Sequence, residues 1–478
     1  MGSTAEPVLR QADRAPTLHP RRWLALAVLL TGAFLPPLDF NVVNLALPAI
    51  RESLGASSSA VQFVMSAYAA TYAVFLITGG RLGDLFGRRR MFRAGVVGFT
   101  LASVLCGTAW SPDALIAGRI LQGLMATIMA PQVLASIRVL FPQAEQGRAL
   151  ALYGATFGLA NICGQLLGGV LVSAHPFGFT WQAIFLINVP IGLVAFIGSL
   201  LFLDESRAEH AQRLDLGGVL LLSITLGCLV YPLVEGREAG WPLWVVAMLA
   251  VSPLALFGFI RFEQRLASRG GSPLVDLGLF HNRGFVAGIG MAFAFYMQSS
   301  FFLTFSVYLQ SGLGLTPIDA GLATLPYVGG GFVASLLSSS VMERLGVRAL
   351  TLGFVLQAIG FSVVVIGVSH QVEWMLVAGL LCSGLGFGIV MPSVIKAVIG
   401  GIDARHAGLA SGIAISTLQV GAALGVAIIG GVFYSALGAN RGLDAYAHAF
   451  TLALSCNIVM LALGGALSLF LRNPRKAA

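Results

Sequence analysis

Charged side chains are scarce in this chain of 478 residues. Asp, Glu, Lys and Arg make up 10% of it, against about 25% in an average soluble domain. Hydrophobic residues make up 57%, and the mean hydropathy is +0.87. A soluble fold has no means of keeping so much apolar surface away from water. The composition therefore excludes an ordinary soluble protein and predicts an integral membrane protein.

The motifs of enzymes and ATP-driven pumps are missing as well. The sequence has no HExxH, no GxSxG and no histidine group with metal-ligand spacing. Its only lysines, Lys396 and Lys476, do not lie in the GxxxxGK loop that cradles nucleotide phosphates. We therefore expect no enzyme activity, no metal site and no cofactor. An ion gradient is the simplest remaining source of energy.

Paired cysteines are also lacking. Five cysteines occur without a CxxC pair, and all lie in apolar stretches, so we interpret them as small buried hydrophobic residues. The N-terminal segment 1–22 is polar and has no apolar core of a signal peptide. We expect it to be a cytoplasmic tail.

Long apolar runs fill most of the sequence. A membrane-spanning helix needs about 20 mostly apolar residues. Fourteen stretches meet this requirement, and the even number predicts that both termini lie on one side. The predicted spans are 23–49, 59–80, 94–110, 114–137, 149–173, 183–203, 216–235, 241–261, 285–310, 319–342, 349–368, 373–395, 407–435 and 446–471.

The basic residues divide unequally between the two sides of these spans. Of the 28 lysines and arginines, 24 fall on the side of the termini and Arg119 falls within a span. The other side receives only Arg51, Arg237 and Arg441. Cytoplasmic loops carry the excess of Lys and Arg, so we expect both termini in the cytoplasm. The net charge of +8 then reflects topology rather than nucleic-acid binding.

A short pattern recurs after the second and the tenth span. The stretches are "GRLGDLFGRRR" at 80–90 and "VMERLGVRA" at 341–349. A shift of 259 residues brings an acid, a glycine and an arginine into register: Asp84 with Glu343, Gly87 with Gly346, and Arg89 with Arg348. With the span count, this repeat predicts two parallel halves of six helices each, separated by spans 7 and 8.

These stretches resemble a known family. The first repeat resembles the loop 2–3 motif of the major facilitator superfamily at Gly80, Leu82, Asp84, Gly87, Arg88 and Arg89. Further stretches resemble motifs of this superfamily and of its fourteen-span drug:proton antiporter branch: "LDFNVVNLALP" (38–48), "GRILQG" (118–123), "FLINVPIG" (185–192), "YLQ" (308–310) and "SGIAISTLQVGAALGVAI" (411–428). The resemblance extends over essentially the whole chain.

The resemblance implies an all-α integral membrane protein with the major facilitator fold and fourteen transmembrane helices. The expected parts are a cytoplasmic tail at 1–22, a six-helix bundle at 23–204, two inserted spans with their flanking loops at 205–284, a second six-helix bundle at 285–472 and a cytoplasmic tail at 473–478.

Asp39 is a carboxylate within the first apolar run, where a charge costs about 2.5–3.5 kcal/mol on insertion scales. An ionisable residue at such a position is a functional candidate by default. Arg119 lies in span 4 at a similar depth, so contact between the two is feasible. We expect Asp39 to carry a proton and Arg119 to help set its proton affinity. The alternative is a static ion pair that joins spans 1 and 4.

The motif after span 2 has two interpretations. Its arginines can simply set the topology. Alternatively, Asp84 can pair with arginines or cap a helix N-terminus, where the helix dipole favours negative charge. Such a contact would act as a latch that closes the inner gate in one state, and the resemblance favours this gating motif.

Span 5 contains glycines at four-residue spacing, which places them on one helix face and allows a neighbouring helix to approach closely. The resemblance to the antiporter motif favours a rocking or leak-preventing contact between the halves, while ordinary packing is the alternative. The glycines are Gly154, Gly158, Gly164, Gly168 and Gly169.

Polar and aromatic side chains within the spans are candidate substrate contacts, although each one can also serve as a hydrogen bond between helices. The candidates are Asn41, Asn44, Tyr68, Gln122, Asn161, Gln165, Tyr296, Gln298 and Gln419.

We therefore expect a proton-coupled efflux antiporter in a bacterial-type inner membrane, which exports amphipathic drug-like compounds by alternating access. Its partners would be a small-molecule substrate, protons and the lipid bilayer, and we expect a monomer. A dedicated exporter of a single metabolite or antibiotic is a close alternative. A non-transporting membrane receptor is an alternative of another class, and the glycines of span 5 disfavour uptake by symport.

Overall fold

The computed structural model describes residues 21–207, 213–399, 402, 407–440 and 442–471, and these residues form helices and no strands. The predicted tails lie almost entirely outside the described residues, and so does Arg441. The α-helices are α1 (Arg22–Leu54), α2 (Ser58–Phe86), α3 (Arg88–Gly107), α4 (Pro112–Leu140), α5 (Gln143–Ala174), α6 (Ala183–Leu186), α7 (Asn188–Phe202), α8 (Leu216–Ala239), α9 (Leu243–Ser268), α10 (Arg283–Tyr296), α11 (Ser300–Val307), α12 (Pro317–Ala323), α13 (Leu325–Leu345), α14 (Arg348–Ser369), α15 (Glu373–Ile399), α16 (Ala407–Leu437) and α17 (Leu443–Ser468).

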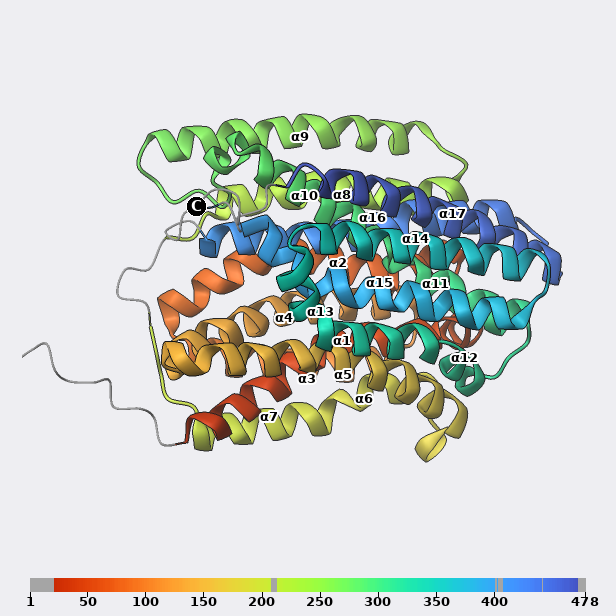
Figure 1. Ribbon diagram of the computed structural model, residues 1–478, viewed down its shortest axis with the longest axis horizontal. Coiled ribbons are helices and arrows are strands. Elements are labelled where there is room, and N and C mark those ends of the chain that lie inside the picture. Colours follow the sequence, from red (N-terminus) through yellow and green to blue (C-terminus); the bar gives the residue numbers. More distant parts are fainter. Residues whose placement is uncertain (1–20, 208–212, 400–401, 403–406, 441, 472–478) are drawn as a thin grey trace, which may run out of the picture.

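Among the described residues, fourteen helical segments are long and apolar enough to cross a membrane, which confirms the predicted number. They lie side by side, with their axes roughly along the long direction of the molecule (Figure 1). The third span differs from its prediction at both ends, because it runs over Arg88–Gly107 instead of 94–110. The reason is Gly87, whose φ of +104° ends α2 and allows α3 to begin at the next residue.

The two ends of this bundle are distinguished by the helix ends that lie at each. The terminal face is the end at which α1 begins and α17 ends, and the distal face is the end at which α1 ends and α17 begins (Figure 1). Both ends of the described chain therefore lie at one face, as an even number of spans requires.

Span 9 is a broken helix. Between α10 and α11 the chain forms a short 3-10 turn, η4 (Met297–Ser299), and after α11 it forms a π-helical turn, η5 (Tyr308–Gly312). Such irregular turns inside a helix often mark functional positions. Gln298 lies in the first of these turns, near the middle of the bundle.

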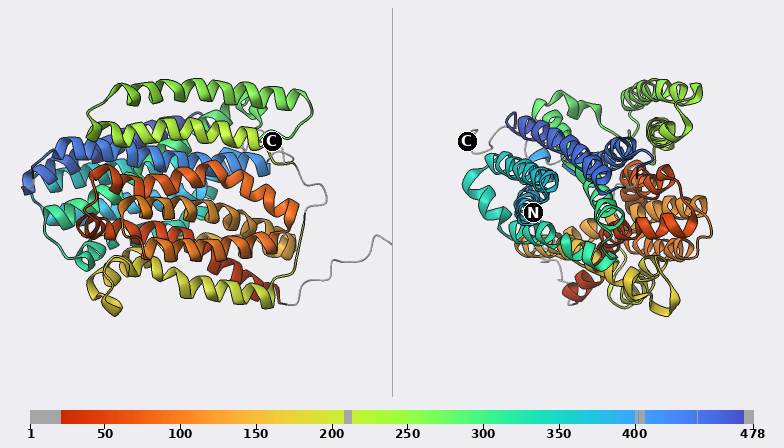
Figure 2. Two further views of the ribbon diagram at one scale, coloured as in Figure 1. Left: turned by 180° about the vertical axis from the view of Figure 1, so that it is seen from behind. Right: turned by 90° about the vertical axis from the view of Figure 1, so that its right-hand side faces the viewer.

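The helices α8 and α9 lie at the side of the bundle (Figures 1 and 2). Helix α8 packs against α2 and α16, and α9 packs mainly against α8. The outer surface of α9 is apolar, with Leu254 69% exposed and Phe257 58% exposed. This pair therefore presents a surface suited to lipid, since exposing so many apolar side chains to water would be unfavourable.

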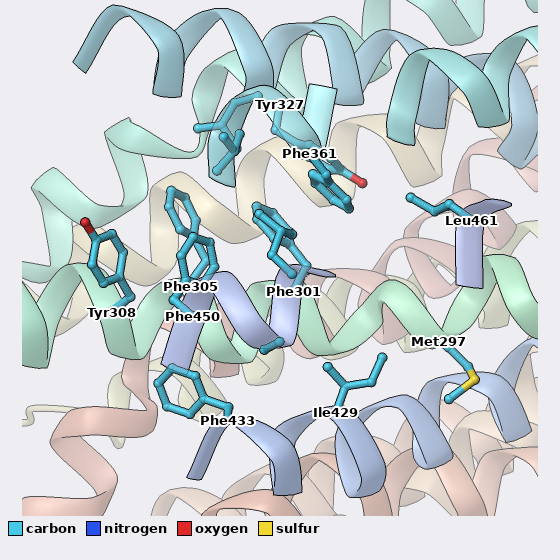
Figure 3. Packing of buried hydrophobic residues seen from close by; sticks show 14 of the residues in the cluster. Met297, Phe301, Phe305, Tyr308, Tyr327, Phe361, Ile429, Phe433, Phe450 and Leu461 are labelled. Atoms are coloured by element: carbon cyan, nitrogen blue, oxygen red, sulfur yellow. The ribbon is translucent and has the colours of Figure 1, made fainter. Parts of the chain in front are cut away.

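The second half of the chain is held together by an aromatic core. Phe301 of α11 packs against Phe305, Tyr327, Phe361 and Phe450, with ring centroids 5.0–6.5 Å apart (Figure 3). These rings come from α11, α13, α14 and α17. Well-packed aromatic cores resist deformation, so these helices are suited to move as one body.

The two halves of the chain touch at the distal side of the bundle. Gln310 Nε2 donates a hydrogen bond to the Leu45 carbonyl at 2.9 Å, and the backbone N–H of Ile318 donates to Ser173 Oγ at 3.2 Å. These contacts join α1 and α5 of the first half to η5 and α12 of the second half. The distal side is therefore closed in this conformation.

Candidate functional site

Asp39 and Arg119 form an ion pair, and both side chains are fully buried. Asp39 lies near the middle of α1, and Arg119 lies two turns into α4. Arg119 Nη1 donates to Asp39 Oδ2. Removing one partner of such a pair leaves an uncompensated buried charge, which costs about 3–5 kcal/mol.

Two amide side chains complete the hydrogen bonds of the carboxylate. Gln122 Nε2 donates to Asp39 Oδ1 at 3.0 Å, and Asn188 Nδ2 donates to the same oxygen at 2.9 Å. Both amides also donate to Ser103 Oγ, at 2.8 and 3.2 Å. Asn188 and Ser103 were not among the predicted members of this site, although Asn188 is part of the stretch "FLINVPIG". A polar residue at the entry to an apolar span was the available signal.

Arg119 is also held by groups of α2. Its Nε donates to the Val64 carbonyl at 2.9 Å, and its guanidinium carbon lies 4.3 Å from the ring centroid of Tyr68. A cation over an aromatic face is attracted by the ring quadrupole, by about 2 kcal/mol or more when desolvated. One nitrogen, Nη2, has no hydrogen-bond partner among the described residues. The arginine therefore connects α1, α2 and α4.

A cavity of about 170 Å³ lies beside this ion pair. Both halves of the chain line it: α1, α2 and α5 from the first, and span 9, α13, α15 and α16 from the second. Six of the nine predicted substrate contacts lie in its wall, namely Asn41, Tyr68, Asn161, Tyr296, Gln298 and Gln419.

Three predicted contacts do not line this cavity. Asn44 donates to the Phe40 carbonyl of its own helix, at 3.0 Å. Gln122 belongs to the buried cluster around Asp39, and Gln165 donates to Asn41 Oδ1 at 3.4 Å. The residue types gave no means of separating these three from the others, because the rotation of each helix about its axis decides which side chains reach the cavity.

Tyr68 links the ion pair to the cavity. One face of its ring lies against Arg119, and the residue also lines the cavity wall. Its buried hydroxyl has no hydrogen-bond partner among the described residues. A buried polar group without a partner is costly, so this hydroxyl is suited to receive a polar atom of a bound molecule.

The second half of the chain carries an uncharged counterpart of this site. The shift of 259 residues that aligns the loop motifs also takes Asp39 to Gln298 and Tyr68 to Tyr327. The hydroxyl of Tyr327 donates to Gln298 Oε1 at 3.3 Å, and Gln357 Nε2 donates to the same oxygen. Both Gln298 and Tyr327 line the cavity. Tyr327 and Gln357 were not among the predicted site residues, and the repeat was the available signal for Tyr327.

The glycines of α5 serve two different contacts. A Cβ at Gly164 would lie 2.6 Å from the Cβ of Asn41, and one at Gly168 would lie 3.1 Å from the Val42 carbonyl, so both allow close packing of α5 on α1. Gly169 and Gly158 face Pro317 and Phe332 of the second half.

Gly154 departs from the expected packing role. A Cβ at this position would meet nothing within 4 Å, and the residue lines the cavity instead. The cause is geometric, because the cavity opens between α5 and the second half at this level. The four-residue spacing was therefore not sufficient evidence for helix contact at Gly154.

The pattern after span 2 makes ion pairs within the first half of the chain. Gly80 and Leu82 lie in the last turns of α2, Asp84 pairs with Arg88 at 3.1 Å, and Gly87 forms the turn. The cap at the N-terminus of α3 comes from Glu205 and not from Asp84, because Glu205 Oε1 accepts from the backbone N–H of Arg89 at 3.1 Å. Glu205 also lies 3.6 Å from Arg90. Glu205 was not among the predicted residues of this motif.

No group of three or more His, Cys, Asp or Glu side chains with the geometry of a metal site occurs in the described part of the chain.

The chain is similar in sequence to several bacterial proteins. It is 38% identical to a probable actinorhodin transporter of Streptomyces coelicolor, over 89% of this chain and 75% of that protein. It is 35% identical to the tetracenomycin C resistance and export protein of Streptomyces glaucescens, over 89% of this chain and 78% of that protein. It is 34% identical to a puromycin resistance protein of Streptomyces alboniger, over 99% of this chain and 96% of that protein.

Solved structures share the fold at low sequence identity. A tetrameric PepTSo2 structure aligns with a TM-score of 0.66 at 14% identity, covering 96% of this chain and 100% of that chain. The xylose transporter XylE from E. coli aligns with a TM-score of 0.63 at 13% identity, covering 95% and 98%. The profile of the Major Facilitator Superfamily matches residues 29–295 and 287–478. The chain therefore belongs to the Major Facilitator Superfamily and is a membrane transporter, not an enzyme.

Proposed function

We propose that this chain is a proton-coupled antiporter that exports an amphipathic drug-like compound, with Asp39 as the proton carrier. The observation that carries the proposal is the buried pair of Asp39 and Arg119 beside a cavity that both halves line. A buried carboxylate whose one charged partner can move away is the simplest device for exchanging a proton between two states. The names of the relatives, which include an export protein and two proteins of resistance or transport, support export.

The geometry supports a simple cycle. In the conformation described here the distal side is closed, and the charge of Asp39 is compensated by Arg119 and two amide groups. When the halves rock and the distal side opens, access of water to the first bundle would let Asp39 take up a proton, which weakens its ion pair with Arg119. When the distal side closes and the terminal side opens, Asp39 would release the proton there, and the restored charge would re-form the ion pair.

Tyr68 could couple substrate binding to protonation, because it contacts both the cavity and Arg119. A molecule in the cavity touches one part of Tyr68, while the face of the ring lies 4.3 Å from Arg119. A bound substrate that shifts the ring would change the position of the guanidinium and thus its contact with Asp39. Substrate release and proton uptake are then coupled through one side chain.

The cavity wall suits an amphipathic molecule. Aromatic rings of Phe40, Tyr72, Phe157 and Phe302 contribute apolar surface, and the uncharged pair of Gln298 and Tyr327 offers polar contacts. The volume of about 170 Å³ is below the roughly 300–1,000 Å³ of sites for drug-sized ligands. We therefore propose that the cavity widens when the substrate enters.

The orientation follows from the charges. The terminal face carries most of the basic residues, so we propose that it faces the cytoplasm of a bacterial inner membrane. The moving units would be the bundles 23–204 and 285–472, with the inserted spans in 205–284, and a monomer would be sufficient because the cavity is formed within one chain.

A dedicated exporter of one compound remains the second candidate. The observation in its favour is that several relatives are named for a single antibiotic, such as actinorhodin or tetracenomycin C. Growth of expressing cells on a panel of chemically unrelated toxic compounds, with and without an uncoupler, separates the two. Protection against one compound alone would favour the dedicated exporter.

The decisive test is Asp39→Asn in proteoliposomes. The amide keeps the shape of the side chain, and Asn188 Oδ1, which has no partner among the described residues, can accept its new N–H after a rotation. We expect the variant to fold and to lose accumulation driven by an imposed pH gradient, while exchange of labelled for unlabelled substrate survives.

The matched control is Asp113→Asn, which makes the same chemical change at an exposed position at the start of α4. It should accumulate substrate as the wild type does. If Asp39→Asn also accumulates substrate as the wild type does, Asp39 is not the obligatory proton carrier.

A further inference from the structure

A second buried polar cluster lies at the terminal face, where the pair α8–α9 joins the bundle. Its centre is Arg81 in α2, which is 7% exposed. Its Nη1 donates to the carbonyls of Arg213 at 3.1 Å and of Ser272 at 2.9 Å, and its Nη2 donates to the carbonyl of Pro273. One carbonyl precedes α8 and two follow α9. A single arginine therefore holds both connections of the inserted pair.

Two carboxyl groups bind the backbone N–H groups of the same connections. Asp215 caps α8, because its Oδ1 accepts from the N–H of Gly218 at 2.8 Å, and its Oδ2 accepts from the N–H of Leu274 at 3.1 Å. Glu263 of α9 accepts through Oε2 from the N–H of Val275 at 2.9 Å. Asp215 is 6% exposed and Glu263 is fully buried. Both carboxyl groups are therefore buried and held by backbone hydrogen bonds, unlike solvated surface acids.

The second carboxyl oxygen of Glu263, Oε1, is buried and without a hydrogen-bond partner among the described residues. It is directed at the carboxyl group of Asp215, and both groups lie against Gly218. Two ionised carboxylates would place two acceptors and two negative charges together. A proton between the two oxygens turns this repulsion into a hydrogen bond.

The surroundings support a single shared proton. Among the described residues, Arg81 is a cation that acts on both carboxyl groups, and it donates its hydrogen bonds to backbone carbonyls. The side chain of Arg213 is exposed and contributes only its carbonyl, and the other neighbours, such as Phe259 and Leu274, are apolar. With one proton, the pair carries one negative charge, which the guanidinium balances. Without it, the buried cluster would carry a net negative charge, which is costly.

We propose that Asp215 and Glu263 form a second proton-binding site, which holds one shared proton and, when occupied, fastens the inserted pair α8–α9 to α2. The site lies at the terminal face, on different elements from Asp39, so the proposal does not depend on the proposed function. Loss of the proton would weaken the hold on segment 271–275. Attachment of the inserted pair would then depend on the pH at this face.

Infrared difference spectroscopy of the purified full-length chain tests for the proton. We expect the C=O band of a protonated carboxyl group at a pH about three units above the ordinary carboxyl pKa of about 4. The band should disappear in Glu263→Gln and also in Asp215→Asn, because each amide supplies its own N–H to the remaining carboxylate. It should remain in Glu145→Gln, which changes a partly exposed carboxylate at the same face.

Hydrogen–deuterium exchange of the segment 271–276 tests the fastening, because the N–H groups of Leu274 and Val275 are bound by the two carboxyl groups. After correction for intrinsic rates, protection in the wild type should fall about tenfold for each pH unit above the point at which the proton leaves. Glu263→Gln, which keeps a donor at all pH values, should show no such fall.

A wild type without the carboxyl band, or a band that persists unchanged in Glu263→Gln, would overturn the proposal. So would equal pH dependence of exchange in the wild type and in this variant. Asp215→Asn makes the test robust, since it removes the same shared proton if Glu263→Gln should fail to fold.

Discussion

At the scale of single residues, the main feature of this transporter is a buried ion pair that is separated from the cavity by one aromatic side chain. Asp39 and Arg119 are both fully buried, and neither lines the cavity. Tyr68 lies between them and the cavity. Burial strengthens the attraction between the charges because the surrounding dielectric is low. Any molecule that displaces the ring therefore acts on an interaction of several kcal/mol.

The ring and the hydroxyl of Tyr68 should have separable roles. Tyr68→Phe keeps the ring over Arg119 and removes the hydroxyl that has no protein partner. We expect weaker substrate binding, by up to about tenfold for one lost hydrogen bond, with unchanged accumulation per unit of pH gradient at saturating substrate. Tyr68→Leu removes the ring as well and should lower the accumulation itself.

Substrate binding to the purified variants and accumulation in proteoliposomes measure the two roles. Asn44→Ala is the control, because the side chain of Asn44 donates to its own helix within the described part of the chain and does not line the cavity. Equal behaviour of Tyr68→Phe and Tyr68→Leu in both assays would show that the ring has no role in coupling.

At the scale of elements, replacing two glycines of the same motif in α5 by alanine should have different effects on stability. Gly164 lies against α1, where a Cβ would come within 2.6 Å of Asn41, whereas Gly154 borders the cavity. Gly164→Ala should lower the free energy of unfolding by about 1–3 kcal/mol through overpacking. Gly154→Ala should leave stability equal or raise it by up to about 1 kcal/mol, because alanine favours a helix.

Thermal unfolding of the two variants in the same detergent gives the comparison, and each serves as the control of the other. A Gly164→Ala variant as stable as the wild type would mean that α1 and α5 have room to separate, and the close contact of these helices would then be without energetic importance.

The turn between α2 and α3 depends on Glu205 more than on Asp84. Glu205 caps α3 and lies near two arginines, whereas Asp84 makes one ion pair along the helix and its side chain is 39% exposed. Glu205→Gln should therefore slow transport more than Asp84→Asn. Neither should change the substrate Kd by more than about twofold, because both residues lie outside the cavity wall.

Transport rate and substrate Kd are measured on the same preparation for each variant. A loss of substrate binding equal to the loss of transport would contradict a gating role, and it would favour the interpretation that this motif only sets topology or stability.

At the scale of the whole molecule, the halves are in contact on the distal side, where α5 meets α12. Cysteines in place of Ser173 and Ile318 would stand at a contact where the serine hydroxyl now accepts from a backbone N–H at 3.2 Å. An oxidised pair should hold the distal side closed and abolish transport, and a reducing agent should restore it. A transporter that works by alternating access cannot complete its cycle with one side locked.

The single variants Ser173→Cys and Ile318→Cys are the controls, and they should transport under oxidising conditions. The native cysteines lie within the spans and are free, so they give a low background. Full transport by a chain shown to be cross-linked would contradict a rocking movement of these two halves.

The features that depend on local composition follow from the order of the amino acids alone. Fourteen apolar runs of sufficient length had to become spans, since an unpaired backbone in lipid is too costly for any other structure, and all fourteen are present. Asp39 and Arg119 were identifiable as candidates because a charge inside an apolar run is costly wherever the helix turns. The repeat across 259 residues was visible in the loops before any packing was known.

Which polar side chains meet depends on how the helices pack in three dimensions. Asn41 and Asn44 are both asparagines of α1 and both donate to a backbone carbonyl of that helix, yet Asn41 lines the cavity and Asn44 does not. Asn188 joins Asp39 across 149 positions, and Glu263 meets Asp215 across the inserted pair. The physical reason is that the rotation and the depth of each helix are set by close packing with all of its neighbours. The type of a residue fixes the cost of burying it, and packing chooses the partner that offsets this cost.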